Sequence, residues 1–277
     1  MTRAVAQRIY SLAYLTANAS TVPEAIGIAA TLGYAQVGLR LLPNGPGGPC
    51  QHLLGDAPLM REVQAQLRDS GVGVFDLEII RIGASFEASA YRPLFEAGQQ
   101  LGARAVLVAA DDPDGARLAD SYARLCECMR PYGLSADLEF MPWTEVRDAR
   151  AALRVLTQAG LPSNAGLLVD ALHFGRSHTT LEDIAAIPRG LLHYAQICDA
   201  QAGTHFSTEA LIQTAREARL LPGEGDIDLG GLFAQLPADL PVSVEVVNLA
   251  RSRPMGDLAW ARLALQASQR VLEGPRA

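Results

Sequence analysis

Several acidic and amide side chains in this sequence come at the ends of short apolar runs. They are Glu78 in VFDLE, Glu139 in SADLE, Asp170 in GLLVD, Gln196 in HYAQICD and Glu245 in VSVE. A carboxylate buried in apolar surroundings loses its hydration, so it needs a metal ion, an arginine or several hydrogen bonds as compensation. These positions are therefore the first candidates for a functional site.

Four of these side chains have the chemistry of a metal-ligand set. Glu139, Asp170, Gln196 and Glu245 follow successive apolar runs, and the carboxyl ends of neighbouring parallel strands would bring them to one point. Three carboxylates and an amide oxygen are hard, oxygen-only ligands that suit Mg2+ or Mn2+ and also accept Co2+. Zn2+ is less favoured because the set has no histidine. The alternative is that each acid pairs with an arginine. Such pairing explains a single acid more easily than four polar side chains at corresponding strand ends.

Two further side chains are candidates beside this set. His173 follows Asp170 by three residues in VDALHFGRS, and histidine suits proton transfer because it titrates near neutral pH. Arg219 precedes LLPGEGDID, where the glycines allow close backbone approach and the guanidinium can hold an oxygen-rich ligand with two hydrogen bonds. The alternatives are a helix-start histidine held by the backbone and a tight turn with a surface arginine.

Three charged side chains on two other predicted strands complete the candidate set. Glu78 and Arg81 lie on one strand and Arg40 on another, and we expect them to line the same mouth as substrate contacts or as ion pairs. The remaining histidines show no partner pattern, so structural or surface positions are expected for His52, His178, His193 and His205. The four cysteines have neither metal-finger spacing nor a secreted framework, and we expect packed free thiols.

The chain contains no lysine, so all 23 of its basic residues are arginine. Schiff-base aldolase chemistry and pyridoxal chemistry require a lysine amine, and the Walker phosphate loop requires its lysine. None of these mechanisms can operate here. If the substrate has a carbonyl group, something other than a lysine must polarise it.

The elements that must position these residues are short apolar runs that alternate with segments of helical periodicity. The strand candidates are IYSLAYL near Tyr10, AQVGLRLL, VGVFDLEIIR, ARAVLVAA, LSADLEF, AGLLVDAL, LHYAQICDA and VSVEVV. The helical windows are Pro23–Leu32, Leu59–Leu67, Tyr91–Leu101, Ala116–Met129, Thr144–Ala159, Leu181–Ile187, Thr208–Ala218 and Met255–Leu272. Eight strands that are each followed by a helix predict a single α/β domain over residues 1–277, a (β/α)8 TIM barrel.

Two features of this pattern refine the prediction. An open doubly wound sheet would alternate similarly, but its nucleotide-binding form would carry GxGxxG after the first strand, and that motif is absent. The loop after the second strand, residues 43–56, is rich in glycine and proline, and it is expected either to lie across the barrel mouth as a lid or to be a plain surface loop.

Composition limits the partners. The chain is 49% hydrophobic and 19% charged, which suffices for a large core, and no apolar run approaches a membrane span, so no membrane partner is expected. A formal net charge of −7 without an arginine-rich stripe disfavours nucleic acid as a partner. The first residues lack a long apolar segment with a cleavage site, so a cytoplasmic protein is expected. By analogy with other barrels, which often associate, a homo-oligomer is a possible partner state.

Five motifs of this sequence resemble successive strand-end motifs of the sugar phosphate isomerase/epimerase, or xylose isomerase-like, TIM-barrel superfamily. They are LEFMPW, VDALHFGRS, YAQICDA, RLLPGEGDID and SVEV. The resemblance covers nearly the whole chain. It implies one divalent metal ion held by Glu139, Asp170, Gln196 and Glu245, with His173 and Arg219 beside it. Gln196 departs from the pattern of the members similar to D-tagatose 3-epimerase, which have histidine on the seventh strand. At this position the chain is similar to the bacterial 3-dehydroshikimate dehydratase branch. The histidine-rich zinc site of the endonuclease IV branch is absent.

The resemblance also implies the chemistry, which is proton abstraction next to a carbonyl through a metal-stabilised enediolate. The expected function is an isomerase or epimerase that acts on a sugar or another small polyhydroxy carbonyl substrate, with Glu139 and Glu245 as base and acid. One alternative is a dehydratase of the 3-dehydroshikimate type, in which His173 removes the proton. Another is a catalytically silent barrel that binds a polyol, although such a barrel has no physical need to keep three carboxylates together.

Overall fold

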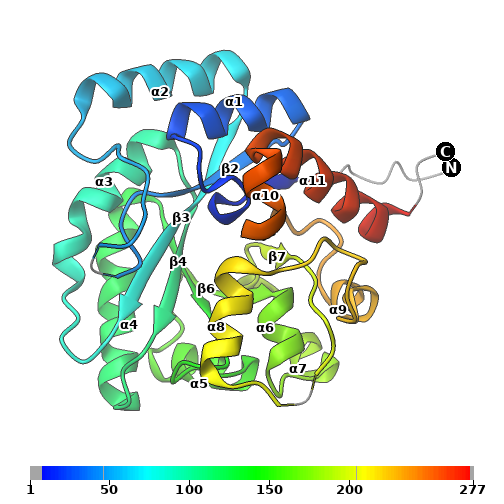
Figure 1. Ribbon diagram of the computed structural model, residues 1–277. Coiled ribbons are helices and arrows are strands. Elements are labelled where there is room, and N and C mark those ends of the chain that lie inside the picture. The colour runs from blue at the N-terminus through cyan, green and yellow to red at the C-terminus, as the bar shows by residue number, and fades with distance from the viewer. Residues whose placement is uncertain (1–7, 46, 204, 275–277) are drawn as a thin grey trace, which may run out of the picture.

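The computed structural model describes residues 8–45, 47–203 and 205–274 of the chain, so part of the N-terminal segment used for the compartment prediction lies outside these residues. Eight parallel strands close into a barrel in sequence order (Figure 1). The strands are β1 (Tyr10–Leu12), β2 (Gln36–Arg40), β3 (Gly73–Ile82), β4 (Ala105–Ala110), β5 (Ser135–Glu139), β6 (Ala165–Asp170), β7 (Ala195–Ile197) and β8 (Val242–Val244). The predicted TIM barrel is confirmed, whereas the single-domain assignment of residues 1–277 stays a prediction.

Helices surround the strands on the outside of the barrel (Figure 1). They are α1 (Val22–Leu32), α2 (Ala57–Ser70), α3 (Arg92–Leu101), α4 (Gly115–Met129), α5 (Ala149–Gln158), α6 (Ala171–Arg176), α7 (Leu181–Ala185), α8 (Thr208–Glu217), α9 (Leu229–Gln235), α10 (Leu249–Met255) and α11 (Asp257–Glu273). None of the described helices is both long and apolar enough to cross a membrane. The last helix packs beside the first, where the Tyr34 hydroxyl donates to the carbonyl of Ala261 at 2.9 Å.

Local sequence explains where most helices begin. Asp114 caps α4 by accepting hydrogen bonds from the amides of Ala116 and Arg117, and Ser207 caps α8 by accepting one from the amide of Ala210. The predicted Thr144–Ala159 helix is wrong at its start. The Thr144 hydroxyl instead bonds the carbonyl of Met141, and α5 begins only after its cap, Asp148. Threonine that bonds its own backbone competes with helix formation, which accounts for the difference.

Three short helices fall outside the predicted windows: α6, α9 and α10. Each spans two turns or fewer, too short for a helical period to show in the sequence. Met255, expected to begin the last helix, ends α10 instead, and Gly256 separates that helix from α11 with a φ of 80°. A positive φ is readily adopted only by glycine, so the break lies at this residue.

Strand register places the candidate residues at one end of the barrel. Asp170 at the end of β6 pairs with Gln196 in β7, and Gln196 pairs with Ser243 in β8, two residues before Glu245. Because all eight strands are parallel, their carboxyl ends open on the same face. The register therefore makes neighbours of Asp170, Gln196 and Glu245, which are far apart in the sequence.

The barrel interior beneath this face contains a second, separate acidic layer. Asp76 on β3 and Asp137 on β5 are fully buried. A Cβ atom at Gly38 would lie 2.8 Å from Asp76 Oδ1, and one at Gly166 would lie closer still to Asp137 Oδ1. Glycine on β2 and β6 thus leaves the space that each carboxylate occupies, because any side chain there would collide with it.

His193 closes this layer at the amino-terminal end of β7. Its Nδ1 lies 2.8 Å from Asp137 Oδ1, and the Ser135 hydroxyl donates to the other carboxylate oxygen at 2.5 Å. The hydrogen bond to Asp137 raises the pKa of His193 above its ordinary value, against the opposing effect of burial. His193 is therefore a structural histidine of the barrel floor.

We predict that His193→Gln destabilises the protein more at pH 5.5 than at pH 9. A folded-state pKa above the unfolded value gives stability that is fully present below the unfolded pKa and is lost as pH rises through the folded pKa. With a discount for partial solvent exposure, the expected loss at pH 5.5 is about 1 kcal/mol. Urea unfolding at both pH values measures it. The exposed His205→Gln is the control, and an equal loss at both pH values would contradict the prediction.

Candidate metal centre

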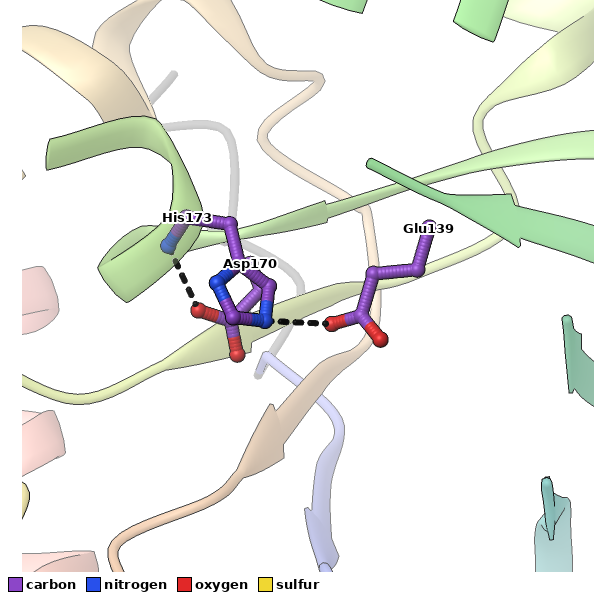
Figure 2. A group of neighbouring side chains, drawn as sticks. All are labelled: Glu139, Asp170 and His173. Atoms are coloured by element: carbon purple, nitrogen blue, oxygen red, sulfur yellow. Dashed lines mark hydrogen bonds and ion pairs between the residues drawn. The ribbon is translucent and has the colours of Figure 1, made fainter. Parts of the chain in front are cut away.

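Three buried side chains form the tightest group of potential metal ligands among the described residues. Glu139 ends β5, Asp170 ends β6 and His173 lies in the first turn of α6. One ligand atom of each lies within 4.8 Å of the others (Figure 2). The group contains His173, which the sequence analysis placed beside the metal ligands, and it does not contain Glu245.

Local backbone structure holds this group together. Asp170 is both the last residue of β6 and the cap of α6, and its Oδ1 accepts a hydrogen bond from the His173 amide at 3.1 Å. The cap turns the chain so that the His173 ring comes back towards β5, where Nε2 lies 3.5 Å from Glu139 Oε1 (Figure 2). The spacing Asp-x-x-His is thus the spacing of a helix cap, which fixes the positions of the two residues relative to each other.

Arg219 bridges two of the predicted ligands. Its Nη1 lies 2.6 Å from Asp170 Oδ2 and its Nη2 lies 2.8 Å from Glu245 Oε2, while Nε donates to the carbonyl of Ala215. The side chain is only 3% exposed, so the alternative of a surface arginine in a tight turn is wrong. Burial alone would raise the pKa of Asp170, but the charge of Arg219 and the hydrogen bonds from Arg219 and the His173 amide outweigh it and leave that pKa below its ordinary value.

Gln196 and Glu245 meet at the same place. The Gln196 Nε2 donates to Glu245 Oε1 at 3.0 Å, whereas Gln196 Oε1 is buried without a hydrogen-bond partner among the described residues. A buried carbonyl oxygen without a donor is costly, and a cation is one group that satisfies it. This unsatisfied oxygen beside three carboxylates fits the oxygen-rich ligand set of a divalent metal ion.

The remaining acids of the group carry a large electrostatic cost. Burial raises the pKa of Glu139 well above its ordinary value, and the charges of Asp170 and Glu245 raise it further. Burial also raises the pKa of Glu245, against the lowering effect of Arg219. Arg219 supplies one positive charge for three buried carboxylates, so a bound cation would favour ionisation of all three together.

His173 is held in its neutral form. Burial, opposed by Asp170 and assisted by Arg219, lowers its pKa to about 4. The ring packs edge-on against Trp143 with centroids 5.0 Å apart, and Nδ1 has no hydrogen-bond partner among the described residues. A neutral imidazole in this position can accept a proton or bind a metal ion.

The group opens into a cavity of about 1250 Å³ at the barrel mouth. Glu78, Arg81 and Arg40 all line it, as expected. Glu78 does not pair with Arg81; it lies 2.6 Å from Arg40, and Arg81 pairs instead with Asp111 at 2.6 Å. These three side chains therefore form ion pairs in the structure, and their role as substrate contacts stays a prediction.

The glycine-rich loop after β2 also reaches this cavity. Asn44, Gly45, Gly48 and Pro49 line the mouth, and Asn44 Oδ1 accepts a hydrogen bond from Arg81 at 2.6 Å. Within that loop, Pro46 lies outside the described residues. The loop is thus part of the cavity wall.

Sequence reasoning assigned no role to several side chains that line the cavity. Trp143 was visible in the quoted motif LEFMPW, two residues after the Met141 that also lines the mouth. Tyr14 follows the first strand, and the Arg40 guanidinium lies 4.4 Å from the centre of its ring. Arg216 is the third, on α8. For Trp143, the signal available was an aromatic residue soon after a predicted strand end.

Comparison with known proteins gives one curated relative. A 3-dehydroshikimate dehydratase of Pseudomonas aeruginosa strain PAO1 is 28% identical over 176 residues, which cover 61% of this chain and 27% of that protein. The chain therefore matches only about a quarter of the length of that relative. The match identifies a segment of similar sequence, and the activity of the whole relative does not transfer with it.

Solved structures show the same fold at low identity. A structure described as IOLI protein with a binding zinc atom superposes with a TM-score of 0.78 at 16% identity, covering 96% of this chain and 98% of that one. D-allulose 3-epimerase from Methylomonas sp. in complex with D-allulose has a TM-score of 0.66 at 17% identity, covering 98% and 99%.

The model of the family described as xylose isomerase-like TIM barrel matches residues 26–267, which include all nine predicted site residues. That family comprises mostly metal-dependent enzymes, among them sugar epimerases and dehydratases. The chain belongs to the xylose isomerase-like TIM barrel family.

Proposed function

We propose that this protein is a divalent-metal-dependent isomerase or epimerase that removes a proton next to the carbonyl of a sugar or another polyhydroxy compound. The observation that carries the proposal is the unsatisfied Gln196 Oε1 among the buried carboxylates of Glu139, Asp170 and Glu245. Mn2+ or Mg2+ suits these oxygens, and the nearby His173 nitrogen extends the choice to Co2+. A divalent ion bound there would polarise a carbonyl group and stabilise negative charge on its oxygen.

The side chains around this group differ in their freedom to move a proton. Glu245 is held by Arg219 and Gln196, whereas the only close partner of Glu139 in the described structure is His173 at 3.5 Å. The raised pKa of Glu139 and the neutral state of His173 suit proton transfer near neutral pH. Glu139 would therefore take the first proton, and Glu245 would supply one to the substrate only in the two-group, epimerase reaction.

A dehydratase is the second candidate, and the asymmetry of the two glutamates favours it. Elimination of water needs one base at the carbon next to the carbonyl and acid assistance for the departing hydroxide, so the Glu139–His173 pair suffices as the base. The 28% identity to a 3-dehydroshikimate dehydratase points in the same direction. Both candidates share the first proton transfer and differ only in the second step of the reaction.

The proposal is tested by elemental analysis of the purified protein, followed by NMR in D2O. EDTA-treated and metal-restored samples are compared with a ketose panel and with 3-dehydroshikimate. About one equivalent of metal with deuterium entering next to the carbonyl supports the isomerase or epimerase, whereas loss of water from 3-dehydroshikimate selects the dehydratase. A protein that binds no metal and regains no activity on adding one would leave only a polyol-binding barrel.

Glu245→Gln is expected to weaken metal binding at least about tenfold and to abolish turnover while the fold remains. The substitution removes a carboxylate charge and leaves the Arg219 side chain with one acidic partner instead of two. Metal titration by calorimetry and circular dichroism measure the two effects. Glu217→Gln, at an exposed acid lining the same cavity, is the matched control. Full metal occupancy in Glu245→Gln would remove that residue from the ligand set.

His173→Asn separates two roles of this histidine. If His173 carries the proton, the variant keeps its metal and loses about 10²- to 10⁴-fold in turnover. If His173 is a metal ligand, both metal affinity and turnover fall. The exposed His178→Asn, in the same region of the chain, is the control. Unchanged turnover with unchanged metal content would show that His173 is only a buried structural residue.

A further inference from the structure

Among the arginines at the mouth of the barrel that the proposed reaction does not use, three interact electrostatically. Arg40 from β2, Arg81 from β3 and Arg216 from α8 all line the same cavity. In Figure 1, α8 is the yellow helix, far along the chain from the blue and cyan segments that carry the other two. The fold thus gathers cationic side chains from three separate elements at one opening.

These three arginines have fewer acidic partners than positive charges. Arg40 binds Glu78, and Arg81 binds Asp111. No ion pair or hydrogen bond joins Arg216 to any residue in the described part of the chain, although the neighbouring Glu217 lines the same cavity. In addition, the Nε of Arg40 is buried without a hydrogen-bond partner among the described residues.

The three positive charges also act on one another. Partial burial lowers the pKa of Arg216, and the charges of Arg81 and Arg40 lower it further. Like charges that are held together lose free energy through repulsion unless an anion lies between them. A guanidinium with unused donors is also the side chain that best binds carboxylate or phosphate oxygens in pairs. An anion bound between these guanidinium groups would relieve the repulsion and use the free donors.

Resting on the proposed function, we infer that the substrate carries an anionic oxygen group, a carboxylate or a phosphate, and that Arg216 binds it together with Arg40 and Arg81. The carbonyl end of the substrate would lie at Glu139 and His173, which line the same cavity. Arg216 is then a specificity-determining residue that selects acidic over neutral polyhydroxy carbonyl compounds. It takes no part in the proton transfer.

The first test compares matched acidic and neutral substrates with the metal-loaded enzyme. The pairs are 3-dehydroshikimate and its methyl ester, D-fructuronate and D-fructose, and D-fructose 6-phosphate and D-fructose. For the preferred acid, Arg216→Gln is expected to raise KM about tenfold to a hundredfold with little change in kcat, because a charge-assisted contact outside the reacting atoms is lost. Arg216→Lys should restore part of the affinity, and the preferred anion distinguishes carboxylate from phosphate.

Arg253→Gln is the control, because Arg253 lines the same cavity from α10 but is not among the charges that act on Arg216. It is expected to leave the KM of both members of each pair unchanged. Equal turnover of the acidic and neutral members, with no selective effect of Arg216→Gln, would overturn the inference while leaving the proposed function intact.

The second test does not depend on turnover. Because the chain has no lysine, phenylglyoxal labels its arginines without competing lysine amines, and mass spectrometry reports each site. Inorganic phosphate or D-glucuronate should slow labelling of Arg216 relative to Arg253, whereas D-glucose at equal ionic strength should not. Protection of Arg216 in a protein that turns over no substrate would separate a correct anion site from a failed reaction proposal. Equal labelling of Arg216 with and without both anions would overturn the site.

Discussion

The guanidinium of Arg219 lies between two buried carboxylates, Asp170 and Glu245, and the polar end of the barrel depends on this contact. Strands β5 to β8 bring acidic or amide side chains to one point, and in a low-dielectric interior their charges would repel one another strongly. One arginine compensates part of that charge and fixes the two acids in place. The Glu139 carboxyl group, whose pKa is raised by burial and by the neighbouring acids, and the unsatisfied oxygen of Gln196 both favour binding of a divalent cation.

The same constraint shapes the barrel beneath the site. Asp76 and Asp137 are buried one layer below, and each lies against a strand position where only glycine fits. Both oxygens of Asp76 lack hydrogen-bond partners within the described residues, whereas Asp137 is held by Ser135 and His193. Burial raises the pKa of Asp76 well above its ordinary value, and the charges of Glu78 and Asp137 add to the shift. The barrel interior therefore combines buried acids with an apolar cluster that includes Phe75 and Tyr194.

Around the mouth, charge is arranged unevenly. The candidate metal centre has three carboxylates and one arginine, whereas among Arg40, Arg81 and Arg216 only the first two form an ion pair in the described structure. The proposed substrate, a polyhydroxy carbonyl acid, would match this arrangement, because its carbonyl oxygen would be drawn to a bound cation and its anionic group to the guanidinium cluster. The long loop after β2 contributes Asn44 to the same wall and holds Arg81 in place.

The sequence by itself determined the barrel and the candidate ligands. Strand and helix periodicities are local, and the acids at Glu139, Asp170 and Glu245 are recognisable because each ends an apolar run. The short helices α6, α9 and α10 escaped prediction because they are too brief for a period to appear.

Only the tertiary structure decided which side chains pair with one another. Nothing in the spacing of residues says that Arg219 bridges Asp170 and Glu245, that Glu78 pairs with Arg40 in place of Arg81, or that Arg216 reaches the mouth. These contacts join residues far apart in the chain, and they depend on how strand register and loop paths place side chains in three dimensions. A sequence pattern carries the type of each side chain, whereas its neighbours, burial and pKa follow from the closed barrel alone.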